Sequence, residues 1–411
     1  MSSVLSVSAG ALLKQSSFLL FLSSRSLSRL ASLVGIVAMG WQIYDLTASA
    51  FALGMVGLVG FLPTAFLVFV AGHAADRYER KRIMQACQLA EALTTAFLAW
   101  GAFAGWLNVV HIFVATLVLG TTAAFENPAT AALLPLIAPK GALQRATALS
   151  SGAAQLATIA GPALGGLAYA VSPGLPYAIM VLFWLLAALL VGAIQLMQPD
   201  EPEAAEKGDA TPGDLFAGVH FIRQSPPILG TISLDLFAVL FGGVTALLPI
   251  YARDILTAGP LGLGILRAAP AVGALLMTSY LARHTIRRHV GLRMFQAVIV
   301  FGVATVVFAL SHWMWLSVLA LAVLGAADNV SVVIRFSLVQ LATPNEMRGR
   351  VGAVNFLFIN ASNNLGQFES GVTAALFGTV PAAVLGGVAT VAVALAWMKL
   401  FPTLRDVDRL E

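Results

Sequence analysis

Ionisable side chains in the middle of long apolar segments are the first feature of this sequence that could do chemistry. The carboxylates are Glu91, Glu126, Asp235, Asp328 and Glu369, and the guanidinium groups are Arg25, Arg29, Arg267 and Arg335. Near the centre of a membrane helix, a charged side chain costs about 2.5–3.5 kcal/mol on insertion scales. Such residues therefore need a partner or a role, and a buried carboxylate suits the uptake and release of protons.

Three of the carboxylates, Asp235, Asp328 and Glu369, lie nearest the centres of their segments when residues are counted at the helical rise. We therefore predict that these carboxylates bind a proton or a substrate. Three further candidates for the same role are Glu126, Arg29 and Arg267. The alternative for each residue is a structural ion pair inside the protein.

Arg25 and Arg29 are four residues apart, a spacing that places both on one face of a helix. They lie nearer one end of their segment than the three central carboxylates do. We expect them to pair with Glu126 or Glu91, because a counter-charge lowers the free-energy cost of a guanidinium group at this depth.

The sequence carries no pattern typical of an enzyme, a metal site or a nucleic-acid-binding surface. It lacks a G-x-x-x-x-G-K-[ST] phosphate loop, and its serines lack a nucleophile-elbow setting. Its six histidines show no metal-ligand spacing, and the single Cys87 excludes an intramolecular disulfide. The net charge is +4, but the basic residues lie between apolar segments rather than on one polar face. We expect no catalytic residue, cofactor, metal or nucleic-acid partner.

The elements that hold these charged groups are predicted to be membrane-spanning helices. Apolar residues make up 59% of the 411 residues and charged residues only 10%, whereas soluble domains contain about 25% charged residues. A span needs about 20 mostly apolar residues. Twelve stretches qualify: 18–44, 51–73, 83–105, 109–136, 145–171, 176–197, 226–251, 261–282, 293–311, 314–341, 351–378 and 381–401. We predict an all-α membrane protein of twelve transmembrane helices.

The distribution of Lys and Arg in the short loops predicts the orientation in the membrane. One set of alternate loops contains twelve of these residues, whereas the other set contains only Arg253. Cytoplasmic loops are enriched in Lys and Arg. We therefore expect a multi-pass protein of the cell inner membrane with both termini in the cytoplasm.

One acidic, proline-containing stretch, 198–214, interrupts the apolar pattern and is predicted to be a linker. The expected organisation is a six-helix bundle at 1–197, a cytoplasmic linker at 198–225, a second six-helix bundle at 226–402 and a cytoplasmic tail at 403–411. The segment 214–224 is either an interfacial amphipathic helix or a lead-in to the seventh span.

The two halves of the sequence repeat each other. An offset of 207 pairs Pro63 with Pro270 and Arg80 with Arg287, and an offset of 205 pairs Arg145 with Arg350 and Gly161 with Gly366. Two pseudo-symmetric halves of six helices follow from this repeat, and transporters built in this way bind substrate near the membrane midplane. Positions that are charged in only one half are the better candidates for function.

Two motifs carry a family resemblance. The loop Gly72-His73-Ala74-Ala75-Asp76-Arg77-Tyr78-Glu79-Arg80-Lys81 resembles the loop signature of the major facilitator superfamily, and the segment containing Gly161, Pro162, Gly165 and Gly166 resembles the antiporter motif of that superfamily. The segments Glu126-Asn127-Pro128-Ala129 and Pro344–Val351 resemble the bacterial branch that contains the enterobactin exporter and macrolide efflux proteins.

The resemblance implies the major facilitator fold and a monomeric secondary transporter. It assigns Gly72, Asp76, Arg77, Arg80 and Lys81 to a cytoplasmic gate, in which Asp76 approaches the N-terminal end of the eleventh span. For the glycine-rich motif, static close packing and bending at a gate are both open. Many proton-coupled drug exporters carry an Arg in the fourth span, which is absent from 109–136.

The expected function is export of small amphipathic molecules, such as drugs, siderophores or metabolites, by alternating access in antiport with H⁺. An importer, a uniporter or a lysophospholipid flippase on the same fold is the first alternative. A membrane scaffold or sensor that transports nothing is the alternative from another class.

Overall fold

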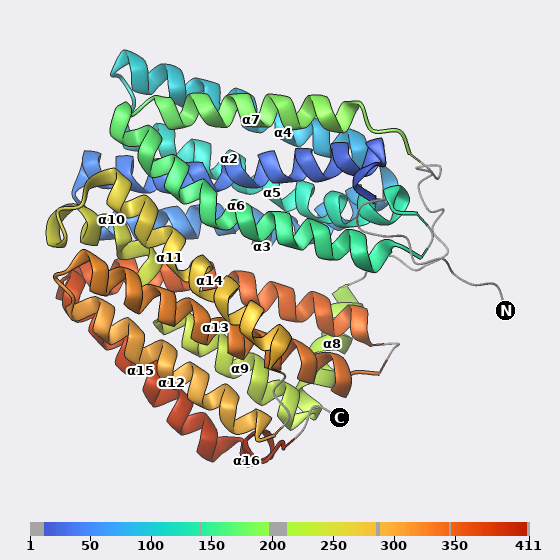
Figure 1. Cartoon of the computed structure of the whole chain (residues 1–411), viewed down its shortest axis with the longest axis vertical. Helices are drawn as coiled ribbons and strands as arrows, with labels where there is room; N and C mark the ends of the chain where they lie inside the picture. The colour runs from blue at the N-terminus through green and yellow to red at the C-terminus, as the bar shows by residue number, and fades with distance from the viewer. Residues whose placement is uncertain (1–11, 140, 197–211, 285–287, 345–346, 409–411) are drawn as a thin grey trace. The chain divides into compact units, whose positions relative to one another are not determined.

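The computed structural model of the chain describes residues 12–139, 141–196, 212–284, 288–344 and 347–408 (Figure 1). Within these residues every regular element is a helix, as the apolar segments predict. Most of the predicted linker 198–214, together with Lys140, Arg287 and both ends of the chain, lies outside the described residues.

The first half of the chain forms six long helices. They are α2 (Ser16–Thr47), α3 (Ala50–Arg77), α4 (Arg80–Ala104), α5 (Val109–Ile137), α6 (Leu143–Val171) and α7 (Leu175–Gly192). Short turns join them: α4 ends at Gly105, whose φ of 77° suits glycine, and the Asn108 side chain accepts a hydrogen bond from the His111 amide to begin α5.

The second half begins with a short helix and a broken span. They are α8 (Pro212–Gln224), α9 (Pro226–Phe241), the 3₁₀ turn η1 (Val244–Leu247), α10 (Leu248–Ile250) and the π-helical turn η2 (Tyr251–Ile255). The remaining helices are α11 (Gly259–Arg283), α12 (Val290–Leu310), α13 (Met314–Ala342), α14 (Arg348–Phe377), α15 (Thr379–Leu400) and α16 (Pro402–Arg405).

Each of the twelve predicted spans coincides with one long helix or, for 226–251, with the broken series from α9 to η2. Among the described residues, ten of these are long and apolar enough by themselves to cross a membrane. The other two, α4 and α14, are equally long but more polar, since α4 begins with three basic residues and α14 contains four asparagines. The chain is a multi-pass membrane protein.

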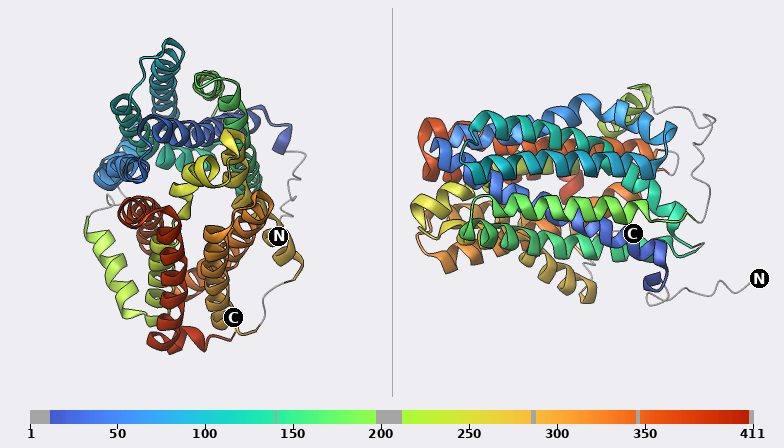
Figure 2. Two further views of the ribbon diagram at one scale, coloured as in Figure 1. Left: turned by 90° about the vertical axis from the view of Figure 1, so that its left-hand side faces the viewer. Right: turned by 90° about the horizontal axis from the view of Figure 1, so that it is seen from above.

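The helices gather into two compact units. One contains residues 1–42 and 62–209, and the other contains 43–61 and 210–411. In the first unit α4 packs along α7 and α5, and in the second α11 packs along α13 and α12 along α15. The left view of Figure 2 looks onto the ends of these helices.

The segment 214–224 is part of a separate helix, α8, which ends just before Ser225 and Pro226. Ile222 of α8 is buried in a cluster with Val339, Val351 and Val354. The described part of α8 is therefore held against α14 by apolar packing, in addition to leading into the seventh span.

Candidate functional site

A buried ion pair and an unpaired carboxylate meet around a small cavity in the second unit. Arg335 of α13 forms an ion pair with Asp235 of α9, and both side chains are almost completely buried. Asp328 and Ser331, two turns and one turn before Arg335 respectively, line the same cavity as Asp235. The cavity has room for about one water molecule.

Helix geometry explains why these groups meet. Positions 328, 331 and 335 are three and four residues apart and therefore lie on one face of α13. Arg335 has Asp235 as its counter-ion, whereas Asp328 makes no hydrogen bond or ion pair with any residue that the structure describes. A carboxyl group at this position can become neutral by binding a proton, or it can compete with Asp235 for Arg335.

A second polar cluster lies between the helices of the first unit. The carboxylate of Glu126 accepts hydrogen bonds from Gln88 Nε2 at 2.8 Å and from Ser28 Oγ at 3.2 Å. Glu91 accepts one from Thr122 Oγ1 at 2.8 Å, and its Oε2 is buried without a hydrogen-bond partner among the described residues. These two glutamates interact electrostatically inside the unit.

The expected pairing of Arg25 and Arg29 with these glutamates does not occur between the described side chains. Arg25 Nη1 donates to Ser150 Oγ at 2.8 Å. Glu126 acts electrostatically on Arg25, but the two side chains are too far apart to form an ion pair. The reason is that Ser28 and Gln88 already satisfy the Glu126 carboxylate. Arg29 is exposed and has no partner in the described part of the chain.

The other two candidates predicted from the sequence, Arg267 and Glu369, lie outside these clusters. Arg267 of α11 is partly buried, and its buried Nε has no hydrogen-bond partner among the described residues. Glu369 of α14 accepts a hydrogen bond from Thr373 Oγ1, one turn along the same helix, at 2.7 Å. Neither residue lines the cavity around Asp235 and Asp328.

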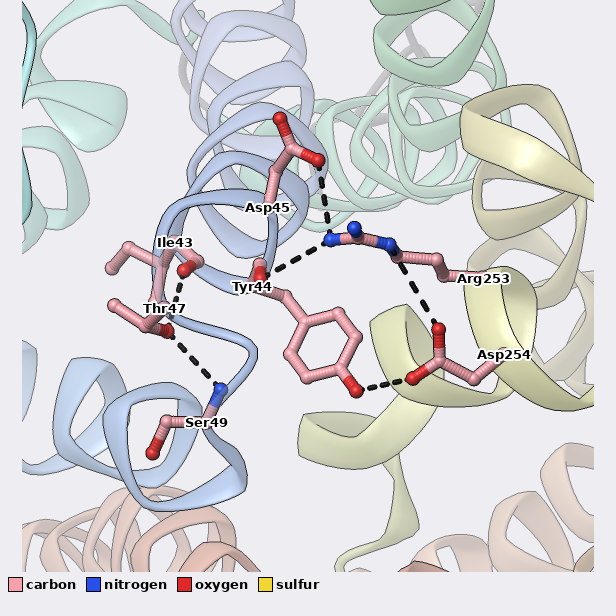
Figure 3. Close-up of polar contacts among 7 residues, drawn as sticks. All are labelled: Ile43, Tyr44, Asp45, Thr47, Ser49, Arg253 and Asp254. Atoms are coloured by element: carbon pink, nitrogen blue, oxygen red, sulfur yellow. Dashed lines mark hydrogen bonds and ion pairs between the residues drawn. The ribbon is translucent and has the colours of Figure 1, made fainter.

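A third group of charged residues joins the C-terminal end of α2 to the turn η2 (Figure 3). Arg253 Nη1 lies 3.1 Å from Asp45 Oδ1 and donates to the Tyr44 carbonyl oxygen at 3.3 Å. The Tyr44 hydroxyl donates to the Asp254 carboxylate, and the Arg253 guanidinium lies 5.5 Å from the centre of the Tyr44 ring. We refer to Tyr44, Asp45, Arg253 and Asp254 as the α2–η2 cluster.

The α2–η2 cluster was not predicted from the sequence, in which Arg253 stands out only as the single basic residue of its set of loops. The offset of 207 pairs Asp45 with Ala252, Leu46 with Arg253 and Thr47 with Asp254. All three charges are therefore present in only one half of the repeat. The same criterion that singled out Asp235 and Asp328 would have found them.

The residues of the loop signature have different environments. Arg80 is buried, Arg77 is exposed, and Lys81 Nζ donates to the Ile194 carbonyl oxygen at 2.8 Å. Gly72 has open space where a Cβ would be. The side chain of Asp76 lies outside the described ones, so its predicted contact with the eleventh span remains a prediction.

The glycines of the antiporter-like motif pack closely against α2. A Cβ added to Gly161 would lie 2.6 Å from Leu33 Cβ, and one added to Gly165 would lie 3.0 Å from the Val34 carbonyl oxygen. Pro162, Gly165 and Gly166 are buried, and α6 continues through Pro162 to Val171. Close helix packing is thus one role of this motif.

The second half of the chain repeats this contact. A Cβ added to Gly366 of α14 would lie 2.9 Å from the Val239 and 3.0 Å from the Leu240 carbonyl oxygen of α9. Gly366 is the counterpart of Gly161, and Leu240 is the counterpart of Leu33. The sequence repeat is therefore also a repeat of helix packing.

Comparison with known proteins identifies the family. A model of the family described as transmembrane secretion effector matches residues 7–411. The chain belongs to this family of the major facilitator superfamily. MFS-type transporter YvqJ of Bacillus subtilis is 26% identical over 374 residues, which cover 89% of this chain and 87% of YvqJ. The resemblance drawn from the two motifs is thereby confirmed.

Two further relatives are efflux proteins by name. Multidrug efflux pump Tap of Mycobacterium tuberculosis is 27% identical over 394 residues, with 91% of each chain covered. Macrolide efflux protein A of Streptococcus pyogenes is 25% identical over 257 residues, which cover 62% of this chain and 63% of that protein. The family and these relatives are transporters, in agreement with the expectation that the chain is not an enzyme.

Solved structures confirm the all-helical transporter fold. The nucleoside transporter NupG has a TM-score of 0.70 and 15% identity, with 93% of this chain and 98% of NupG covered. A bacterial homologue of the human lysosomal transporter Spinster has a TM-score of 0.72 and 13% identity, covering 94% of this chain and 95% of the homologue. At these identities the likeness concerns the fold alone.

Proposed function

We propose that this protein exports small amphipathic molecules across a bacterial inner membrane by alternating access, in exchange for protons. Tap and macrolide efflux protein A, which resemble the chain, are named for efflux. The excess of basic residues in alternate loops supports cytoplasmic termini. A monomer is sufficient for this function, because one chain supplies both halves of the repeat.

The observation that carries proton coupling is the unpaired carboxylate of Asp328 beside the Asp235–Arg335 ion pair. Exchange of ions needs a group that can be charged in one state and neutral in another. Asp328 meets this requirement because a cavity with room for about one water molecule adjoins it. Glu126 is less suitable, since two donors, Ser28 Oγ and Gln88 Nε2, already occupy its carboxylate.

Proton binding at Asp328 would change the charge balance on α13. With Asp328 protonated, Arg335 and Asp235 neutralise each other and the cluster has no net charge. With Asp328 ionised, two carboxylates share one guanidinium group, and the cluster favours a different arrangement of α9 and α13 or a bound cation. We propose that this difference couples proton release to the conformational change.

Alternating access also requires that each end of the passage opens in turn. The α2–η2 cluster lies at the end where the loops carry few basic residues, which the orientation rule places outside the cell. Opening of the outer end would separate Asp45 from Arg253. We therefore propose that this cluster holds the outer end closed.

Transport into vesicles tests the proposal. Proteoliposomes with an acidic interior would be given macrolides, siderophores or cationic dyes outside, with and without a protonophore. We expect at least one compound to accumulate inside, and we expect the protonophore to abolish its accumulation. Accumulation that instead requires an acidic exterior would identify an importer.

Substitution of Asp328 connects this activity to the site. Asp328→Asn should lose accumulation driven by the proton gradient while it retains exchange of labelled for unlabelled compound. Asp406→Asn is the matched control, because Asp406 is exposed and lies beyond the last long helix. Proton coupling through this site is wrong if Asp328→Asn accumulates the compound as the wild type does.

A further inference from the structure

The arginines of α2 have no carboxylate counter-ion among the described residues, in contrast to Arg335, which pairs with Asp235. Arg25 has one described hydrogen bond, to the neutral Ser150 hydroxyl, and Arg29 has none. Arg29 is the fourteenth of the 32 residues of α2, close to the middle of the helix. Glu126, which acts electrostatically on Arg25, accepts hydrogen bonds from Ser28 and Gln88 instead.

An unpaired guanidinium group differs chemically from an unpaired carboxyl group. A carboxyl group can lose its charge by binding a proton, whereas a guanidinium group keeps its charge at every physiological pH. Asp328 can therefore be neutral without a partner, but Arg29 cannot. A permanent cation within a membrane-spanning helix needs water or an anion beside it.

The surrounding residues of α2 show which face carries this charge. Arg25, Arg29, Ser32 and Ile36 are partly or fully exposed and lie three or four residues apart along one face. The adjacent face, with Ser24, Ser28 and Ala31, is buried inside the first unit. Because lipid would solvate Arg29 poorly, this exposed face of α2 suits water or a polar ligand group better than lipid.

We propose that this face of α2 binds the acidic group of an amphipathic anion, such as a carboxylate, sulfonate or phosphate. The planar guanidinium groups of Arg25 and Arg29 suit such groups, which they can bind through two parallel hydrogen bonds. Ile36, about 10 Å farther along the helix, would contact the apolar part of the same ligand. The proposal rests on the proposed transport function and specifies its substrate class.

A matched pair of dyes tests the charge preference without any proton gradient. Fluorescein is an anion and rhodamine 123 is a cation, and both share the xanthene ring system. Their binding to purified full-length protein in nanodiscs of phosphatidylcholine would be measured by fluorescence anisotropy. We expect fluorescein to bind the wild type more tightly than rhodamine 123 does.

Variants of the arginines assign the preference to this face. Arg29→Gln should weaken fluorescein binding about tenfold or more, equivalent to ~1.4 kcal/mol, without weakening rhodamine 123 binding. Arg29→Lys should restore part of the affinity, which also shows that the site tolerates substitution. Arg82→Gln is the control, because Arg82 pairs with Glu79 at an exposed position.

The fluorescein-binding measurement also shows where the anion can come from and which results would contradict the proposal. If added phosphatidylglycerol displaces fluorescein from the wild type, the acidic group can come from a lipid headgroup, and the anion site stands. The proposal is overturned if the wild type does not bind fluorescein, or if Arg25→Gln and Arg29→Gln together leave its binding unchanged. Such a failure would leave gradient-driven transport, measured separately in vesicles, unaffected.

Discussion

At the scale of single residues, the buried charges of this protein fall into groups with different chemical requirements. Asp235 and Arg335 neutralise each other, and their loss would affect the fold first. Asp328 is next to them without a partner. We therefore expect two neighbouring carboxylates of one cavity to have different roles, Asp235 in stability and Asp328 in transport.

Substitution of Asp235 is expected to destabilise the protein. Asp235→Asn leaves the buried Arg335 guanidinium without its counter-ion, and loss of one partner of a buried pair costs about 3–5 kcal/mol. Thermal and denaturant unfolding in detergent would show a lower free energy of unfolding. Asp328→Asn, which removes no described hydrogen bond or ion pair, should change it little.

A double substitution provides the control for this prediction. Replacing both partners, Asp235→Leu with Arg335→Met, should recover most of the lost stability, because no uncompensated charge remains. Equal unfolding of the wild type and Asp235→Asn would mean that the ion pair contributes nothing to stability.

At the scale of helices, small residues determine how closely neighbouring elements approach. Gly165 of α6 lies against the backbone of α2, and Gly366 of α14 lies against α9 at an equivalent position of the repeat. A third close contact joins Gly54 of α3 to Gly371 of α14, both of which belong to the second unit. In a membrane, close approach of backbones replaces the hydrophobic effect as a source of association.

Enlargement of Gly165 is expected to separate α6 from α2. A Cβ at this position would already lie 3.0 Å from the Val34 carbonyl oxygen, and Gly165→Val would add two further methyl groups. Overpacking of this kind costs about 1–3 kcal/mol, to be measured as a lower midpoint of thermal unfolding.

The same helix offers a matched control for Gly165. Gly152→Val introduces the same side chain where nothing lies within 4 Å of the added Cβ, so its unfolding midpoint should stay near that of the wild type. A similar loss of stability in both variants would show that helix propensity, not the contact with α2, is responsible.

At the scale of the whole molecule, the chain divides within α2 and α3 rather than between the repeated halves. Residues 43–61 group with the second unit, and the α2–η2 cluster is one of the contacts that attach them there. Exposed ion pairs are individually weak, at about 0–1 kcal/mol. A contact of this strength can hold a conformation and still be broken during each transport cycle.

Neutralising Asp45 is expected to loosen this end of the protein. In Asp45→Asn, hydrogen–deuterium exchange of residues 43–55 and 251–258 should become several times faster, because local opening costs less free energy. The charge-swapped variant, Asp45→Arg with Arg253→Asp, should return exchange toward the wild-type rate. Glu79→Gln, which removes a surface ion pair with Arg82, should leave both segments unchanged. Unaltered exchange in Asp45→Asn would show that the cluster does not hold this end closed.

The sequence by itself determined the helices, most of their ends and the family. Apolar length and turn residues are local properties, so each predicted span coincides with a long helix or, for 226–251, with a broken helical series. The repeat of Gly161 at Gly366 correctly indicated equivalent packing. The two motifs correctly indicated the superfamily.

Only the tertiary structure decided which charges meet. Helical spacing places Arg25 and Arg29 on one face, yet Ser150, 125 residues away, is the hydrogen-bond partner of Arg25 instead of a glutamate. Tyr44 and Asp254 meet across 210 residues of sequence. The physical reason is that spacing along one helix fixes the face a side chain occupies, whereas its partner depends on which helices pack against that face and at what height.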